Sequence, residues 1–220
     1  MKKLFFAVTI ILASISVAEA QTGFGIRGGG NFSNLSGDLQ NESRYENKVG
    51  FHAGVFLNFP VVGEFFSIQP ELIYSQKGFE NSEEEFSFLG QNYKRTGKVN
   101  YNYLDLPVLA KIKAGPIYFE GGPQASYLLN VNNETKEYMN GNLQSSTTTE
   151  RDKEGLKEFE LGYAAGVGFA TNSGISLGLR YNGSFNDFVD ENSEEYFDGD
   201  LGSAKHSVIM LTLGFRLGGN

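Results

Sequence analysis

The stretch between residues 99 and 129 constrains the fold most, because apolar side chains recur at every second position on both sides of a short turn. The apolar positions before the turn at residues 113–116 are Leu104, Leu106, Val108, Ala110 and Ile112, and those after it are Ile117, Phe119, Ala125, Tyr127 and Leu129. A period of two is typical of β-strands, whose successive side chains point to opposite faces. Each arm has about 12 residues, and a tilted strand needs roughly 9–11 to cross a membrane. The pattern predicts a membrane-sized hairpin.

The same alternation occurs in six further segments, so the sequence predicts eight strands in all. Besides the two arms of the hairpin, the segments are residues 23–33, 49–59, 65–79, 158–171, 175–185 and 207–217. Three connections are short, at residues 60–64, 113–116 and 172–174, and four are long and polar, at residues 34–48, 80–98, 131–157 and 187–204. Short turns at one end and long loops at the other are typical of bacterial outer-membrane barrels. The predicted fold is an all-β, eight-stranded antiparallel up-and-down transmembrane β-barrel, with both termini periplasmic.

The first 20 residues have the pattern of a secretory signal peptide. Lys2 and Lys3 precede an apolar stretch, and Ala18-Glu19-Ala20 supplies a small-x-small cleavage motif. We expect cleavage after Ala20, which leaves residues 21–220 as the barrel domain. No later segment approaches the roughly 18 consecutive apolar residues of a membrane-spanning helix. The absence of cysteine excludes disulfides, and a net charge of −8 argues against nucleic acid as a partner.

Alternation alone does not say whether the apolar face points into a soluble barrel or out toward lipid. The polar face carries charges of both signs and many small residues, such as those at 162–168, which suit a narrow lumen. We therefore expect the apolar face to contact lipid. Five tyrosines are expected to form an interfacial girdle near the loop ends: Tyr74, Tyr101, Tyr103, Tyr127 and Tyr181.

Three prolines, Pro70, Pro107 and Pro123, lie inside predicted strands. Proline cannot donate a backbone hydrogen bond, so each removes one bond from the ladder. We expect bulges or local kinks at these positions.

The predicted lumen contains charged side chains that should pair with one another. The interior of an eight-stranded barrel is just wide enough for side chains to fill it, and an unpaired buried charge is costly. Six residues are expected at similar mid-barrel heights: Arg27, His52, Glu71, Asp105, Glu120 and Arg180. We expect a salt-bridged plug in which His52 lies close to Glu71; a narrow or gated ion path is the alternative.

The fourth long loop is acidic and has no basic residue. Its acidic residues are Asp187, Asp190, Glu191, Glu194, Glu195, Asp198 and Asp200. Calcium takes six to eight oxygen ligands, but the regular spacing of a known calcium loop is missing, so we predict a solvated loop and neither a metal nor a cofactor. The chain has only two histidines, His52 and His206, and neither has the spacing that nucleophilic catalysis would require. We predict no enzymatic activity.

Several barrel motifs carry a family resemblance. They are GIRGGGNFSNL (25–35), YLDLPVLAK (103–111), FEGGPQASYL (119–128), GYAAGVGF (162–169), LRYN (179–182) and LTLGFRL (211–217). With them the chain resembles the PorT-like family of small outer-membrane barrels, which has the OmpA-type architecture. The resemblance spans nearly all of residues 21–220 and implies the fold, but no particular chemistry. One branch of the family is associated with protein secretion.

These observations predict a monomeric outer-membrane protein with a plugged lumen. Binding commonly resides in loops held by a rigid scaffold, and 19 of the 26 acidic residues lie in the four long loops. We expect a structural scaffold or surface-binding protein that contacts lipid and lipopolysaccharide and binds extracellular protein or glycan through its loops. The alternative is a component of outer-membrane transport or protein secretion.

Overall fold

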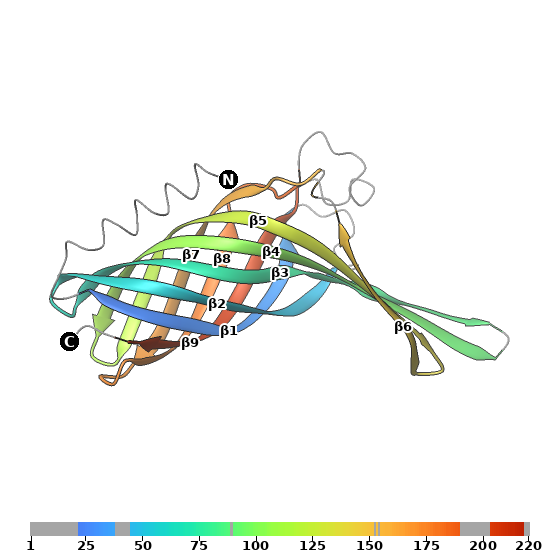
Figure 1. Ribbon diagram of the computed structural model, residues 1–220, viewed down its shortest axis with the longest axis horizontal. Coiled ribbons are helices and arrows are strands. Elements are labelled where there is room, and N and C mark those ends of the chain that lie inside the picture. Colours follow the sequence, from blue (N-terminus) through green and yellow to red (C-terminus); the bar gives the residue numbers. More distant parts are fainter. Residues whose placement is uncertain are drawn as a thin grey trace.

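The computed structural model describes residues 22–37, 45–88, 90–151, 153, 155–189 and 203–217. The strands within these ranges are β1 (Gly23–Ser36), β2 (Tyr45–Val62), β3 (Phe66–Phe88), β4 (Gln91–Ala114), β5 (Ile117–Met139), β6 (Asn142–Arg151), β7 (Phe159–Ala170), β8 (Ile175–Ser184) and β9 (Lys205–Arg216). Eight of them form a closed antiparallel ring in the order β1-β2-β3-β4-β5-β7-β8-β9, because β9 pairs back onto β1 (Figure 1). The predicted eight-stranded barrel is confirmed. No helix in the described part of the chain is long and apolar enough to cross a membrane.

The apolar face of the ring points outward. On β9, the outward side chains of Ile209, Leu211 and Leu213 are 46%, 47% and 59% exposed, whereas the inward Met210 and Thr212 are buried. The same alternation runs along β7 and β8. Lipid solvates such a face without cost, as expected for a transmembrane barrel.

The tyrosine girdle is confirmed only in part. Tyr127 and Tyr181 are exposed on the outer face, at 40% and 38%, and Tyr74 is half-exposed. Tyr101 and Tyr103 were wrongly predicted to belong to the girdle, because both are fully buried inside the barrel. Both lie an even number of residues from the inward-facing Asp105, so the period-two rule directs them into the lumen.

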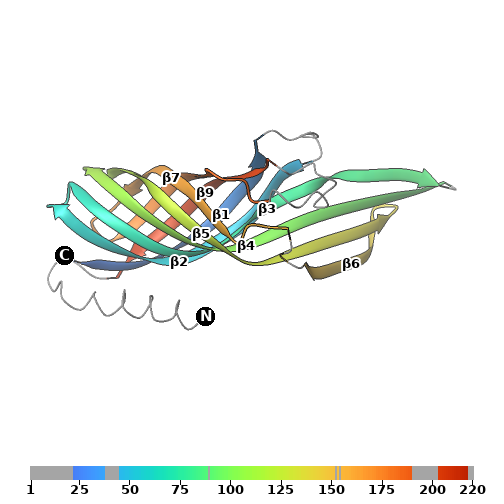
Figure 2. The same cartoon turned by 90° about the horizontal axis from the view of Figure 1, so that it is seen from above.

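Two of the predicted long loops are folded as a sheet. Strands β3, β4 and β5 continue past the end of the barrel, where β6 adds a fourth strand (Figures 1 and 2). Residues 80–88, 91–98, 131–139 and 142–151, which were predicted to lie in loops, are therefore in strands. Asn140 and Gly141, with φ of 48° and 80°, connect β5 to β6. Positive φ at both residues is the signature of the tight hairpin turn that Asn-Gly favours.

No bulge occurs at Pro70, Pro107 or Pro123, so that part of the expectation is wrong, and a local kink at these positions stays a prediction. Pro70 pairs with Val108 and Ile73 with Asp105 in one register, and Pro123 pairs with Tyr163 within an unshifted ladder. The register shifts occur elsewhere, for example between Asn102 and Tyr103. The φ of proline, about −65°, lies within the β region, so a strand can pass through proline while losing only one hydrogen bond.

An apolar cluster, which we call the cap, lies at the mouth of the barrel opposite the short turns. Its residues are Leu35, Phe79, Val99, Tyr101, Tyr103, Leu128, Val131, Leu156, Phe188, Val189 and Ala204. The segments that follow β6 and β8 contribute to it. Leu156 forms a β-bridge with Val189, and the amide of Phe188 donates a hydrogen bond of 3.1 Å to the carbonyl of Ala204. Leu156, Phe188 and Val189 therefore pack over the lumen instead of pointing into solvent.

Candidate functional site: the barrel lumen

Four charged residues from four strands meet across the lumen. Arg180 on β8 donates to Glu71 on β3 at 2.7 and 3.0 Å, and to Glu120 on β5 at 2.7 Å. Arg27 on β1 pairs with Glu71 from the other side. We call Arg27, Glu71, Glu120 and Arg180 the four-charge cluster. It holds two cations and two anions and ties opposite walls of the barrel together.

The cluster is dry and nearly saturated. None of its four side chains is more than 6% exposed. Gln69 supplies Glu71 with a further hydrogen bond of 2.6 Å. Buried charges are tolerated only when paired and hydrogen-bonded, which explains why Glu71 accepts from both arginines. Two atoms of the cluster, Arg27 Nε and Glu120 Oε2, are buried without a hydrogen-bond partner in the described part of the chain.

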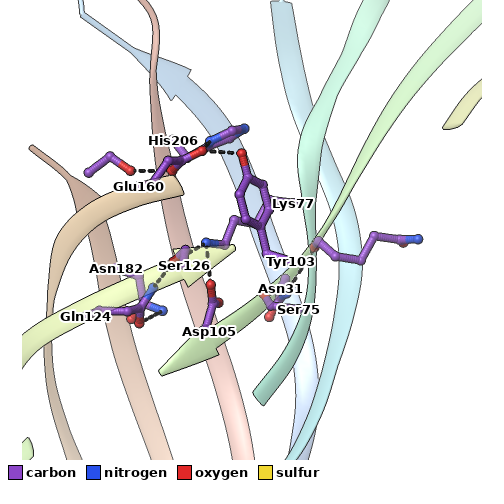
Figure 3. Close-up of polar contacts among 12 residues, drawn as sticks. Asn31, Ser75, Lys77, Tyr103, Asp105, Gln124, Ser126, Glu160, Asn182 and His206 are labelled. Atoms are coloured by element: carbon purple, nitrogen blue, oxygen red, sulfur yellow. Dashed lines mark hydrogen bonds and ion pairs between the residues drawn. The ribbon is translucent and has the colours of Figure 1, made fainter. Parts of the chain in front are cut away.

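Two of the six residues predicted for the interior network lie outside the cluster. Asp105 binds Lys77, whose Nζ lies 2.9 Å from Asp105 Oδ1 and 3.3 Å from the hydroxyl of Ser126 (Figure 3). His52 pairs across the β2–β3 ladder with Ser75, whereas Glu71 pairs with Phe56, so the two are not cross-strand partners, and neither a hydrogen bond nor an ion pair joins them.

His52 belongs to a separate, uncharged layer of hydrogen bonds. Its Nδ1 lies 2.7 Å from Asn31 Oδ1, and its Nε2 lies 3.0 Å from the hydroxyl of Thr212. The side chain of Asn31 in turn donates to Ser75 at 3.1 Å. The imidazole therefore cross-links the inner faces of β1, β2 and β9.

A further carboxylate layer lies just below the cap. Glu160 accepts hydrogen bonds from Tyr103 and from Ser184 (2.7 Å), and its Oε1 lies 3.0 Å from Nδ1 of His206 (Figure 3). Glu160 belongs to the polar face that the sequence predicts to point inward, but its contact with His206 was not predicted, although alternation along β9 also directs His206 inward. The ring of His206 stacks against Phe188 of the cap, with centroids 4.5 Å apart.

The Glu160 layer does not have the order of a nucleophilic triad. In a triad the hydroxyl is hydrogen-bonded to the imidazole, and the carboxylate orients the other ring nitrogen. Here the Ser184 hydroxyl donates to the carboxylate itself. The arrangement stabilises a buried charge and leaves no activated nucleophile.

Glycines on β7 and β8 make room for a tyrosine that lies across the lower lumen. A Cβ at Gly168 would lie 2.5 Å from the hydroxyl of Tyr118, and one at Gly178 would lie 2.4 Å from it. Real Cβ atoms do not approach that closely, so both positions require glycine while Tyr118 keeps this pose. The expectation that small residues suit a narrow lumen agrees with this contact.

The acidic loop lies mostly outside the described residues. Asp187 is described, and its Oδ1 lies 3.9 Å from Nζ of Lys205. Asp190, Glu191, Glu194, Glu195, Asp198 and Asp200 lie outside the described residues, as does the predicted signal peptide. Within the described ranges, no group of three or more histidine or acidic residues could hold a metal ion.

The family follows from the sequence match that accompanies this fold. The model of the outer membrane protein beta-barrel domain matches residues 19–190. The chain belongs to this family. It is therefore an outer-membrane protein, in agreement with its lipid-facing apolar surface. No curated protein matches the chain significantly.

Solved structures with a similar fold include three small barrels. Ail of Yersinia pestis, solved with the heparin analogue sucrose octasulfate, is 14% identical, with a TM-score of 0.45 over 90% of this chain and 100% of that one. Neisserial surface protein A is 12% identical, with a TM-score of 0.43 over 88% and 97% of the two chains. OprG of Pseudomonas aeruginosa is 14% identical, with a TM-score of 0.33 over 90% and 96%.

Proposed function

We propose that this protein is a closed-lumen surface-binding protein of the outer membrane and not an enzyme. The observation that carries the proposal is the pair of barriers in series along the lumen. The four-charge cluster closes the middle of the barrel, and the cap closes the mouth above it. A solute would have to break buried ion pairs and also displace a packed apolar cluster. Both are costly.

The binding surface in this proposal is the sheet extension formed by residues 79–88 of β3, 91–99 of β4, 131–139 of β5 and all of β6. It takes the role that the sequence analysis gave to the long acidic loops. Every residue of β6 is exposed, and among the described strands β6 pairs with β5 alone. A free edge presents unpaired backbone donors and acceptors that another extended segment can join.

The side chains of β6 leave this edge unprotected. The run from Asn142 to Thr149 contains no charge and no proline, which are the usual devices that keep an edge strand from pairing. The partner that best fits such an edge is an extended segment of an extracellular protein. Glycan binding on the extension is a second form of the same function.

Further proposals concern the setting of the barrel. We propose that residues 1–20 are removed and that the short-turn end is periplasmic, with the extension facing outward. In support, the amide of Leu217 donates to the carbonyl of Phe24, so β1 begins where β9 ends, and the amide of Arg216 donates to Gly174 in the short β7–β8 turn. We also propose that the barrel is monomeric, contacts lipopolysaccharide through its loops, and belongs to the PorT-like branch suggested by its motifs.

Single-channel conductance of the refolded barrel in a planar bilayer tests the closed lumen. We expect no steady conductance in the wild type, in Arg180→Ala or in Phe188→Ala, because each single variant keeps one barrier. The double variant removes both and should leak. Steady conductance of the wild type would contradict the proposal and make transport or secretion the leading function.

A further inference from the structure

The lumen is open at the short-turn end, where it forms a cavity of about 240 Å³. Its floor contains Gln69 and Lys111, and its rim contains Glu64, Lys113 and Arg216. The four-charge cluster begins immediately above the floor, because Glu71 is the next inward position after Gln69 on β3. The cavity, which we call the vestibule, is therefore a dead end that a molecule can enter only from the short-turn side.

The vestibule and the cluster above it carry more positive than negative charge. The cationic residues are Arg27, Lys111, Lys113, Arg180 and Arg216, and the carboxylates are Glu64, Glu71 and Glu120. This excess stands out in a chain whose net charge is −8. An uncompensated charge is costly where low-dielectric walls surround it.

Lys111 is one cation of this positive excess that no carboxylate of the described residues pairs with. It lies directly opposite Glu120 in the β4–β5 register. Both contacts of Arg180 with the Glu120 carboxylate, at 2.6 and 2.7 Å, are to Oε1, and although Glu120 Oε2 has no hydrogen-bond partner among the described residues, Lys111 does not reach it. Among the described residues no carboxylate lies within ion-pair distance of Lys111. Its Nζ lies 3.4 Å from Gln69 Oε1 and 3.8 Å from the ring centroid of Tyr118.

The two rim cations differ from one another. Lys113 Nζ lies 2.9 Å from Glu64 Oε2, and this hydrogen bond lowers the pKa of Glu64, so that pair is neutral overall. The guanidinium of Arg216, in contrast, has neither a hydrogen bond nor an ion pair to any described residue. Lys111 at the floor and Arg216 at the rim therefore keep most of their donors unused, and both line the same cavity.

We propose that the vestibule binds one anionic group, a carboxylate or a phosphate, between Lys111 and Arg216. The volume is below the roughly 300–1,000 Å³ of a drug-sized pocket, so it suits a single anionic headgroup and not a whole polymer. Arginine presents a planar fork that matches carboxylate and phosphate oxygens, and the lysine adds a point charge. The ligand is a periplasmic one if the short-turn end faces the periplasm.

The test is a titration of the refolded, ¹⁵N-labelled barrel in neutral detergent micelles, followed by amide chemical shifts. Sodium phosphate and sodium acetate are added separately, against sodium chloride at matched ionic strength. We expect saturable shifts confined to the vestibule. Saturation by phosphate alone assigns a phosphate ligand, and saturation by acetate alone assigns a carboxylate. The affinity should fall at least tenfold in Arg216→Gln and in Lys111→Met.

Two further variants make the test decisive. Lys98→Met, which removes a cation from the extension, should leave the titration unchanged. Glu71→Gln makes the lower lumen more positive and should tighten binding. If neither anion saturates, or if Arg216→Gln binds as the wild type does, the proposal is wrong. Arg216 is at the rim, so this variant stays informative even if Lys111→Met fails to fold.

Discussion

Replacement of Arg180 by methionine is the strongest available perturbation of the lumen. The side chain is 1% exposed and donates to two carboxylates. Methionine keeps much of the volume, but among the described residues it leaves Glu71 with Arg27 as its only ion-pair partner and Glu120 with one ion-pair contact, 4.0 Å from Arg27. Removal of one member of a buried ion pair typically costs about 3–5 kcal/mol. We expect the free energy of unfolding to fall by that amount.

Urea titration of the barrel in lipid vesicles, followed by circular dichroism, measures this loss. The matched control is Lys98→Met, which removes an ion pair of 2.6 Å on the extension with both side chains about one-third exposed. An exposed pair of this kind contributes at most about 1 kcal/mol.

A double variant separates charge from packing. Arg180→Met combined with Glu71→Gln leaves one cation and one anion in the cluster, so it should cost less than the sum of the two single variants. A loss below about 1 kcal/mol in Arg180→Met, together with simple additivity in the double variant, would refute the view that the cluster cross-links the barrel.

Two other predictions concern the lower lumen and the extension. Gly178→Leu should destabilise the barrel by roughly 1–3 kcal/mol because its Cβ would meet the Tyr118 hydroxyl at 2.4 Å, whereas the nearest backbone atom, the Val167 carbonyl oxygen, is 3.7 Å away. Tyr118→Ala should therefore rescue it in the same urea titration; no rescue would show that the clash has another source. On the extension, a labelled peptide with the sequence of residues 131–139, the natural neighbour of β6, should bind the free edge in a fluorescence anisotropy assay. Adjacent residues point their amides to opposite sides of a strand, so either Ser146→Pro or Thr147→Pro should reduce peptide binding at least tenfold without unfolding the β5–β6 pair. Unchanged binding in both variants would contradict strand addition at β6.

The barrel was predictable because lipid and lumen impose opposite chemistries on alternate residues. Residues 175–182 of β8 illustrate this: the outward positions 175, 177, 179 and 181 are apolar or aromatic, whereas the inward positions 176, 178, 180 and 182 are polar or small. The same rule, applied consistently, places Tyr103 and Glu160 inside. Tyr103 was wrongly placed in the girdle because its aromatic type was given more weight than its spacing of two residues from the inward-facing Asp105. Likewise, Asn140-Gly141 is a strong hairpin signal that indicates a β5–β6 turn within the segment predicted as a loop.

The contacts inside the lumen were less predictable. They depend on how neighbouring strands are aligned, and not only on which residues of each strand face inward. Alternation directs His52 and Glu71 inward correctly, but their partners are set by how β2 and β3 are aligned. His52 pairs with Ser75, four residues from Glu71, and the shift of one residue between Pro60 and Val62 is too small to account for that difference. The position of the β2–β3 turn sets this alignment. A change of alignment at the turn moves every residue pair further along the two strands. The alternation pattern does not give this alignment, so it cannot say which inward charges meet.

The distribution of unsatisfied groups indicates where this barrel can act. Above the four-charge cluster, the polar side chains of Lys77, Glu160 and His52 already have partners within the lumen, and the cap covers them. Some buried polar atoms of the lumen also have no partner, for example Asp105 Oδ2, Asn182 Oδ1 and His206 Nε2, but they are shielded from solvent. The unsatisfied groups that an outside partner can reach are at the two ends. At one end they are the backbone groups at the edge of β6, and at the other they are the donors of Lys111 and Arg216. In the proposed function a barrier separates these two ends, so each would recognise its own partner. The closed middle is the reason for proposing binding, and not passage, for this chain.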